Sequence, residues 1–365
     1  MRLAFRVDAS QTIGAGHVSR CLALADHMRE AGHESHFFCK DHPGNLREEI
    51  VARGHPATMI NVDPRSLPLR SLTDYSSWVG GTWEDDVAQT KRALSKYAPN
   101  WIIVDHYGLD ARWEREIGTS CQVMVIDDLA NRKHLCRMLV DQNIGRMGSD
   151  YDDLVSQDSR KLIGPRYALL GREFSEKREI SLLRRRSSRV KKILISFGGV
   201  DQANASELTL LSLAHCMLPD DIQIVVALGS ASPWRDRVVR CASEAPFPCD
   251  VVVGSASIAS LMAESDVSIG AGGGMALERC CMGLPTILVV LADNQAEGSQ
   301  ALARLGAALG PIYPDEIAPR LCSLLSELQV ADTLQSCIRQ ASGVTDGKGC
   351  ARVAEQLSAV GAVDA

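Results

Sequence analysis

Short apolar runs alternate with amphipathic stretches along the first half of this 365-residue chain. The apolar positions of residues 21–31 recur at helical spacing and end before Gly32, and Pro99 ends a second expected helix over Trp83–Tyr97. Strands are expected around these helices, at Leu3–Val7, Ser35–Cys39, Ala57–Ile60, Trp101–Val104 and Val123–Ile126. Strands and helices that alternate in this way predict a parallel sheet covered by helices on both faces.

The same alternation starts again in the second half, after a polar and strongly basic stretch over residues 172–192. Helices are expected from about Ala203 and Met275, and strands at Lys192–Phe197, Ile222–Ala227, Asp250–Val253, Val267–Ile269 and Pro285–Val290. The sequence therefore predicts an α/β protein with two Rossmann-like parallel-sheet domains and a cleft between them. We place the domains at residues 1–173 and 191–365, with a linker over 174–190 and a tail that is able to pack back on the first domain.

The charge balance limits the classes of partner. Thirty-nine basic and 45 acidic residues leave a formal net charge of −6, without the positive excess of a protein that binds nucleic acid. The longest nearly unbroken apolar run, Thr286–Ala292, is far shorter than the roughly 18 residues of a membrane-spanning helix. Arg6 and Asp8 also interrupt the apolar core that a signal peptide needs. We expect a cytoplasmic protein with a small-molecule partner and without nucleic-acid or membrane partners; the oligomeric state stays open.

The 12 cysteines are scattered along the chain without a C-x-x-C pair. We expect reduced, mostly buried thiols rather than a disulfide or zinc framework. The adjacent carboxylates Asp127 and Asp128 follow an expected strand, but no histidine or third carboxylate stands at ligand spacing. We therefore expect them to form loop hydrogen bonds, and we expect neither a metal site nor a cofactor.

A first glycine loop follows the opening strand, where ligands bind in doubly wound sheets. Gly14 and Gly16 allow a tight turn and a close approach to a ligand, and His17 begins the next helix. An imidazole in that place is suited to act as a general base at neutral pH. The alternative is a histidine that only caps or packs at the turn. The loop has neither the Gly-Lys-Ser/Thr of a Walker sequence nor the third glycine of G-x-G-x-x-G.

A second glycine loop, in the other half, has four glycines within five residues and leads into a helix near Met275. The amides of Gly272, Gly273, Gly274 and Met275 are therefore placed to hold a diphosphate without a lysine. Glu278, one helical turn later, is a candidate acceptor for the two ribose hydroxyls. The alternative for Glu278 is a solvated carboxylate near a helix N-terminus.

A third polar loop follows the next expected strand. Asp293, Asn294 and Gln295 supply amide and carboxylate groups that can bind sugar hydroxyls or N-acetyl groups. Helix capping by Asp293 or Asn294 is the alternative.

These motifs together resemble a known family. The segment GAGGGMALERCCMGLPTILVVLADNQ is similar to the nucleotide-sugar half of MurG-type glycosyltransferases, which have the GT-B fold. Combined with further motifs from Leu3 onward and a matching tail near Thr345, it resembles the PseG-type hydrolases of pseudaminic acid biosynthesis. The further motifs are FRVDAS, IGAGHVSRCLALA, VDHYGLD, VIDDLANRKH, LVDQN, IGPRYALLGREF, ILISFGGVDQAN and TDGKGCARV.

The resemblance implies an enzyme that hydrolyses UDP-2,4-diacetamido-2,4,6-trideoxy-β-L-altropyranose to UDP and the free sugar, with inversion and without a metal. It implies His17 as the base, with Asp8 beside it to orient the ring. It also implies that Tyr107 and Asn294 line the sugar pocket and that Glu278 serves the UDP. The other residues implied in substrate binding are Arg6, Gly14, Gly16, Gly272, Gly273, Gly274, Met275, Asp293 and Gln295.

Three alternatives remain at this stage. An inverting glycosyltransferase would pass the same kind of sugar to an acceptor. The sugar could also belong to a related nonulosonic acid route, such as that of legionaminic acid, because the sequence does not specify stereochemistry. A third alternative is a sensor that binds a nucleotide sugar without reacting with it.

Overall fold

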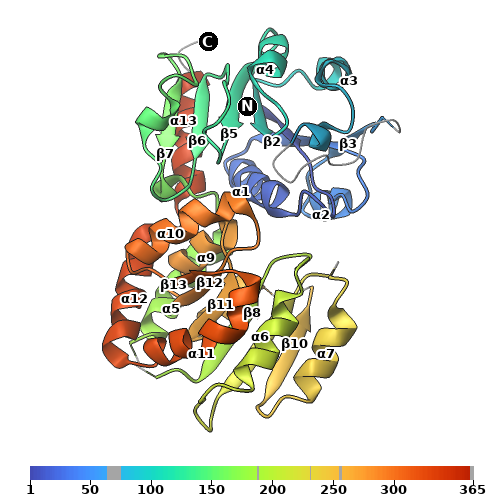
Figure 1. Cartoon of the computed structure of the whole chain (residues 1–365). Helices are drawn as coiled ribbons and strands as arrows, with labels where there is room; N and C mark the ends of the chain where they lie inside the picture. The colour runs from blue at the N-terminus through green and yellow to red at the C-terminus, as the bar shows by residue number, and fades with distance from the viewer. Residues whose placement is uncertain (64–74, 187–188, 231, 255–256, 362–365) are drawn as a thin grey trace. The chain divides into compact units, whose positions relative to one another are not determined.

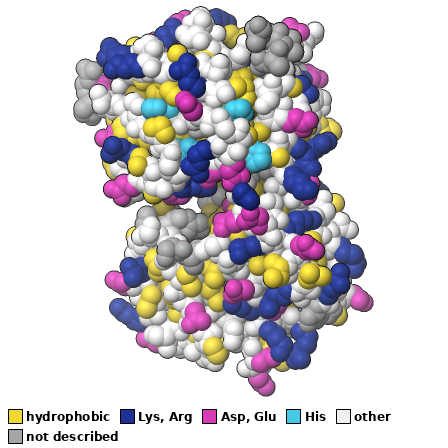
Figure 2. Space-filling model, turned by 180° about the vertical axis from the view of Figure 1, so that it is seen from behind, with side chains coloured by type: hydrophobic (Ala, Val, Ile, Leu, Met, Phe, Trp, Pro, Cys, Tyr) yellow, Lys and Arg dark blue, Asp and Glu magenta, His cyan; other side chains and the backbone are white. Residues whose placement is uncertain are grey.

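The computed structural model describes residues 1–63, 75–186, 189–230, 232–254 and 257–361, which form two compact units. Unit 1 comprises Met1–Gly171 together with the C-terminal segment from Lys348, and unit 2 comprises Arg172–Gly347. Basic and acidic side chains are interspersed on the face shown in Figure 2. Within the described residues, no helix is both long enough and apolar enough to cross a membrane.

Unit 1 contains a parallel seven-stranded sheet with the order β3-β2-β1-β4-β5-β6-β7 (Figure 1). Its strands are β1 Arg2–Val7, β2 Glu34–Lys40, β3 Ala57–Ile60, β4 Trp101–Asp105, β5 Gln122–Ile126, β6 Met138–Asp141 and β7 Arg160–Ile163. Its helices are α1 Gly16–Glu30, α2 Arg47–Ala52, α3 Trp83–Tyr97, α4 Ala111–Ile117 and α13 Gly349–Gly361, and its 3-10 turns are Tyr75–Val79, Gly148–Tyr151 and Pro165–Tyr167.

Side chains of β1 alternate between two hydrophobic cores. Leu3 and Phe5 pack in the core that contains buried residues of α1 and α13, among them Leu357. Ala4 points to the opposite core, which contains Trp113 of α4. The sheet of unit 1 is therefore covered on both faces, as the sequence predicts.

Unit 2 contains a parallel six-stranded sheet with the order β10-β9-β8-β11-β12-β13. Its strands are β8 Lys192–Ser196, β9 Gln223–Leu228, β10 Cys249–Val253, β11 Val267–Ala271, β12 Thr286–Val289 and β13 Leu309–Ile312. Its helices are α5 Arg172–Arg184, α6 Ala205–Leu213, α7 Arg235–Ser243, α8 Ile258–Glu264, α9 Gly274–Cys281, α10 Ala296–Arg304, α11 Ile317–Leu328 and α12 Ala331–Val344, with 3-10 turns at Asp293–Gln295 and Pro314–Glu316.

The stretch expected to be a linker, residues 174–190, is helical as far as Arg184, and α5 belongs to unit 2. Within α5, Ser181 Oγ donates a hydrogen bond to the carbonyl of Met282 at 2.7 Å, and Arg178 donates to the carbonyl of Ser342 at 2.7 Å. The attachment of the helix thus includes polar side chains, beside the buried Phe174. Its composition therefore resembles that of a solvated linker, although its backbone is ordered secondary structure.

The tail also differs from the expected division at residue 191. Helix α13 belongs to unit 1, where it packs against α1 and the 3-10 turn Pro165–Tyr167 (Figure 1). Val353 and Leu357 of α13 are fully buried in the core that includes β1. The chain thus returns to its first unit, which was the option that the sequence left open for the tail.

Two further features differ from the expectations. Strands β6, β7 and β13 were not predicted, and β13 contains Pro311, which counts against a strand assignment. Cys216 and Cys322 form a disulfide, so the expectation of reduced thiols is wrong for this pair, although ten cysteines are free. The pair is separated by 106 residues and is brought together because α6 packs against α11.

Candidate functional site

The first glycine loop connects β1 to α1 through a tight turn. The N–H of Gly14 donates to the carbonyl of Ser10 at 2.9 Å, and Gly14 has a φ of +81°, where L side chains are strained. A Cβ atom built on Gly14 or on Gly16 would meet nothing within 4 Å. The loop therefore presents open space next to the first turn of α1, where helix amides lack intrahelical partners.

His17 lies in that first turn and is 8% exposed. Its Nδ1 is 2.5 Å from Oδ1 of Asp105, a fully buried carboxylate at the end of β4. Because an ionised carboxylate only accepts hydrogen bonds, Nδ1 is the nitrogen that donates to Asp105, and a neutral ring then has its lone pair on Nε2. Nη2 of Arg20 lies 3.2 Å from the same Nδ1. The pair is therefore arranged to let Nε2 take up a proton from a ligand or water.

The carboxyl group that orients His17 differs from the predicted one. Asp8 was expected beside the ring, but its Oδ1 accepts from Arg6 Nη1 at 2.6 Å and from the backbone N–H of Lys40 at 2.6 Å. Its Oδ2 lies 3.1 Å from Nε2 of His106. Asp8 is thus held in the interior beneath the loop, and Asp105 occupies the position beside His17.

Arg6 was expected to bind substrate, but its side chain is fully buried. Besides Asp8, it contacts Asp86 of α3, whose Oδ2 is 2.8 Å from Arg6 Nη2. Burial alone would raise the pKa of Asp8, but the charge of Arg6 and the contact with His106 hold that pKa well below its usual range. Arg6 and Asp8 are therefore parts of an internal ion-pair network that supports the loop.

Asp105 is kept ionised in the same way. Burial would raise its pKa, but the charges and hydrogen bonds of Arg20 and His17 hold the pKa well below its usual range. Arg20 reaches Asp105 with Nε at 2.6 Å and with Nη2 at 2.7 Å. Neither Arg20 nor Asp105 was singled out from the sequence; the strand-end position of Asp105, two residues before Tyr107, was the available signal.

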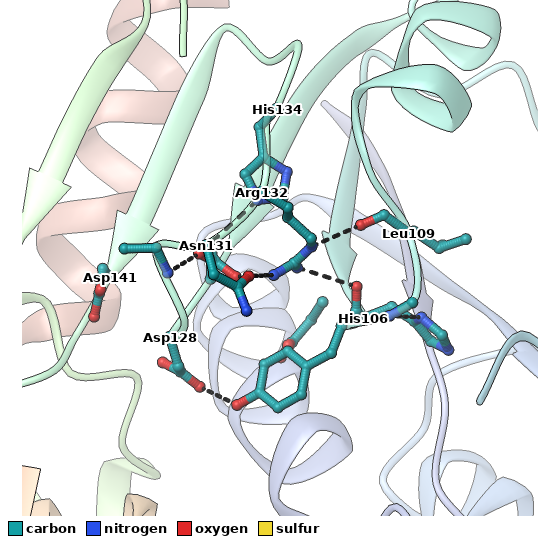
Figure 3. Close-up of polar contacts among 12 residues, drawn as sticks. His106, Leu109, Asp128, Asn131, Arg132, His134 and Asp141 are labelled. Carbon is teal, nitrogen blue, oxygen red and sulfur yellow. Dashed lines mark hydrogen bonds and ion pairs between the residues drawn. The ribbon is translucent and has the colours of Figure 1, made fainter. Parts of the chain in front are cut away.

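Tyr107 forms an aromatic wall next to His17. Its ring meets the imidazole edge-on at a centroid distance of 4.6 Å and stacks on Trp78 at 5.4 Å. Its hydroxyl donates to Oδ2 of Asp128 at 2.8 Å (Figure 3). Since the proton is used in this bond, the Tyr107 oxygen is left to accept a hydrogen bond from a ligand hydroxyl or amide.

The adjacent carboxylates Asp127 and Asp128 have different contacts. Asp128 accepts from the Tyr107 hydroxyl, whereas Asp127 has other partners. Asp127 is buried, accepts from Arg132 at 2.6 Å and from Tyr151 at 3.0 Å, and so forms the expected loop hydrogen bonds. Arg132 also donates to the carbonyls of Leu109 and His106 (Figure 3). No group of three or more His, Cys, Asp or Glu side chains within the described ranges is arranged to hold a metal ion.

The second glycine loop connects β11 to α9 in unit 2. Gly273, with a φ of +74°, is the N-cap of α9, and a Cβ on Gly272 would come within 2.4 Å of Ser299 Oγ. Nothing lies within 4 Å of a Cβ on Gly274. The loop requires glycine for its conformation and packing, and it leaves the first-turn amides of α9 on an open side.

Glu278 lies on α9 and is partly exposed. Burial, with a further contribution from the charge of Glu173, raises its pKa to about 7, against the smaller opposing effect of Arg279. The carboxyl group therefore changes its charge near neutral pH. Met275, in the first turn of the same helix, is partly exposed as well.

The third polar loop forms the 3-10 turn Asp293–Gln295 before α10. Asp293 and Asn294 are exposed, and neither side chain caps the turn or the helix within the described residues. Gln295 accepts from the backbone N–H of Leu291 at 3.1 Å. The two exposed side chains are thus available to a ligand, while Gln295 has a structural contact.

The predicted site residues group by unit. Arg6, Asp8, Gly14, Gly16, His17 and Tyr107 lie in unit 1, and the remaining ones, Gly272, Gly273, Gly274, Met275, Glu278, Asp293, Asn294 and Gln295, lie in unit 2. Of the first group, the structure joins His17 and Tyr107 by ring contact, whereas Arg6 and Asp8 form an ion pair with each other.

Comparison with solved structures identifies the fold. MurG of Acinetobacter baumannii superimposes with a TM-score of 0.67 over 98% of this chain and 99% of that chain, at 15% sequence identity. The spinosyn rhamnosyltransferase SpnG gives a TM-score of 0.63 over 97% of this chain and 100% of that chain, also at 15% identity. The chain has the GT-B fold.

Sequence comparison finds three distant relatives of note, whereas no protein-family model matches the chain. A UDP-2,4-diacetamido-2,4,6-trideoxy-β-L-altropyranose hydrolase of Campylobacter jejuni is 25% identical over 84% of this chain and 97% of its own length. An uncharacterized protein of Methanocaldococcus jannaschii is 23% identical over 81% of this chain. The spore coat polysaccharide biosynthesis protein SpsG of Bacillus subtilis is 29% identical over 54% of this chain. The chain spans little more than half of these last two relatives, 57% and 58% of their lengths.

Replacing Asp86 by alanine should destabilise unit 1 by about 3–5 kcal/mol, because it leaves the buried Arg6 and Lys40 without a shared carboxylate. Urea unfolding followed by tryptophan fluorescence measures this, since Trp234 is the one tryptophan outside unit 1. The exposed Glu84→Ala, on the same helix, is the matched control and should change stability little. Equal midpoints for the two variants would contradict the assignment of the network.

Proposed function

We propose that this chain is a hydrolase that cleaves a UDP-linked 2,4-diacetamido-2,4,6-trideoxy sugar at the anomeric C–O bond and releases UDP and the free sugar. The observation that carries the proposal is the His17–Asp105 pair at an open glycine loop, in which Nδ1 faces the carboxylate and Nε2 is left for a ligand or water. The similarity to the C. jejuni hydrolase supports the substrate class, because it covers 97% of that enzyme. The product would enter pseudaminic acid synthesis.

In the proposed reaction, Nε2 of His17 takes a proton from water as the water oxygen bonds to the anomeric carbon. The bond from that carbon to the diphosphate oxygen breaks, and its electron pair leaves with UDP. Attack from the face opposite the leaving group inverts the anomeric configuration. Asp105 stabilises the imidazolium that forms, as in other His–carboxylate pairs.

The leaving group is proposed to bind at the head of α9. Amides of the first turn, beside Gly273 and Gly274, match the negative charge that develops on the diphosphate. Glu278 would accept hydrogen bonds from the ribose hydroxyls. In unit 1, the Tyr107 oxygen is an acceptor, which suits a substrate that presents acetamido N–H groups.

A glycosyltransferase is the second candidate, and the GT-B neighbours favour it, since MurG and SpnG are structures of that fold and SpnG is named as a rhamnosyltransferase. Incubation of the protein with a panel of UDP-sugars in the absence of any acceptor separates the two. We expect UDP release with the diacetamido trideoxy sugar, and NMR of the fresh product should show the inverted anomer. UDP release only when an acceptor alcohol is added would reject the hydrolase.

His17→Ala should lower kcat by about 10²-fold or more, because the water loses its general base, while UDP affinity stays unchanged. The matched control is His215→Ala, an exposed histidine of unit 2, which should retain wild-type turnover. Steady-state kinetics and calorimetry with UDP measure the two quantities. A parallel loss of UDP affinity would assign His17 to binding rather than to chemistry.

Glu278→Gln should weaken nucleoside binding by about tenfold, since a charged acceptor is replaced by a neutral one. Because the pKa of Glu278 is about 7, wild-type affinity should rise between pH 6 and pH 8 as the carboxylate ionises. Uridine is the suitable probe, because it has no phosphate that titrates in this range. If the affinity of wild-type and variant for uridine follows the same pH course, Glu278 does not bind the ribose.

A further inference from the structure

Arg20 lies three residues after His17 on α1 and is 9% exposed. Its guanidinium contacts two carboxylates that come from different strands of the unit 1 sheet. Nε and Nη2 bind Asp105, which ends β4, at 2.6 and 2.7 Å. Nη1 binds Oδ2 of Asp128, which follows β5, at 2.6 Å. One side chain therefore joins the ends of two adjacent strands to the first turn of α1.

The contact with Asp105 fixes the carboxylate that faces His17. Both oxygens of Asp105 accept from Arg20, so the carboxylate plane is held by a two-point interaction. The charge of Arg20 also balances that of Asp105 in the interior. Loss of this cation would leave the buried carboxylate with an uncompensated charge, and the carboxylate that faces His17 would lose its two-point contact.

The contact with Asp128 extends the network to Tyr107. Oδ2 of Asp128 accepts both from Arg20 and from the Tyr107 hydroxyl, the latter at 2.8 Å. The Tyr107 ring in turn packs edge-on against the imidazole of His17. The five side chains thus form a closed ring of contacts, in the order His17, Asp105, Arg20, Asp128 and Tyr107.

Other polar groups near this ring do not replace Arg20. The cation Arg146 donates to the backbone carbonyl of Asp128 at 3.2 Å, and Arg132 lies over the Tyr107 ring; neither of these contacts involves Asp105. Cys21 donates weakly to Asp105, with its Sγ 3.5 Å from Oδ2, and burial raises the pKa of its thiol, so it stays neutral. Asn143 Nδ2 lies 3.4 Å from Oδ1 of Asp128. Neither group carries a positive charge or reaches both carboxylates in these contacts.

We propose that Arg20 is a positioning residue that holds His17 in its Nε2 lone-pair tautomer and fixes Tyr107 in the same unit, with Asp128 as the link between them. The effect on turnover rests on the proposed hydrolase function, whereas the effect on the His17 ring does not.

The direct test is ¹⁵N NMR of the histidine rings, with the His17 signals assigned by comparison with His17→Ala. At pH 7 the wild-type ring should show a protonated Nδ1 and an unprotonated Nε2. In Arg20→Lys, the single ammonium lacks the two-point geometry for Asp105 and cannot also reach Asp128, so the ring should become mixed in tautomer or doubly protonated. An unchanged His17 signal in Arg20→Lys would overturn the proposal.

Asp128→Asn provides a second variant that preserves the side-chain shape. It removes the charge that holds both Arg20 and the Tyr107 hydroxyl, so kcat should fall by on the order of 10²-fold through misplacement, with UDP affinity unchanged. Wild-type kcat in this variant would also overturn the proposal. The control is Arg53→Gln, which breaks an ion pair with Asp26 elsewhere on α1 and should alter neither readout.

The hydrolase function and the positioning role of Arg20 are tested by separate measurements. If the wild-type protein hydrolyses no UDP-sugar, the proposed function is rejected, while the NMR comparison of Arg20→Lys with Arg53→Gln still decides the positioning role. If hydrolysis is found but the ring signals are identical in all variants, the function stands and the positioning role is rejected.

Discussion

The site in unit 1 depends on the ion pairs that compensate the buried negative charge of Asp105. A carboxylate without solvent is costly unless cations and hydrogen-bond donors surround it, and here Arg20 and His17 supply both. The same condition that stabilises the charge also determines which nitrogen of His17 carries the proton. The contacts that stabilise the buried charge thus also orient the His17 ring, at the end of the strand that carries Asp105.

A second buried network, around Arg6, connects other elements of unit 1. It joins Asp8 below the loop to Asp86 on α3, so it ties β1 to a helix that covers the sheet. The two networks lie on neighbouring strands, since β1 pairs with β4 and Arg6 is opposite Val104. The ion pairs of Arg6 therefore support the strand that leads into the β1–α1 loop, while Asp105 and Arg20 hold His17, which follows that loop.

The net charge of −6 is compatible with an anionic ligand because glycine loops can bind through backbone amides. The head of α9 provides such amides beside Gly273, whose positive φ is required for the entry into the helix. The charge therefore argues against a long polyanion such as nucleic acid, but it does not limit a binding site made of helix amides.

Sequence periodicity was enough to predict most strands, the bounds of α3 and the two-sheet architecture, because buried parallel strands and amphipathic helices have distinct local patterns. It was also enough to point to His17, which stands at a strand-to-helix loop, whereas Tyr107 was implied by the family resemblance alone. It was not enough for α5, α13 or the Cys216–Cys322 pair, whose places depend on polar or distant contacts. The family resemblance implied Asp8 as the partner of His17, but the tertiary structure gives Asp105, 88 residues away from the histidine. The reason is physical: local pattern determines which segments form strands and helices, whereas the pairing of β1 with β4 and the contacts of α1 decide which carboxylate meets the ring.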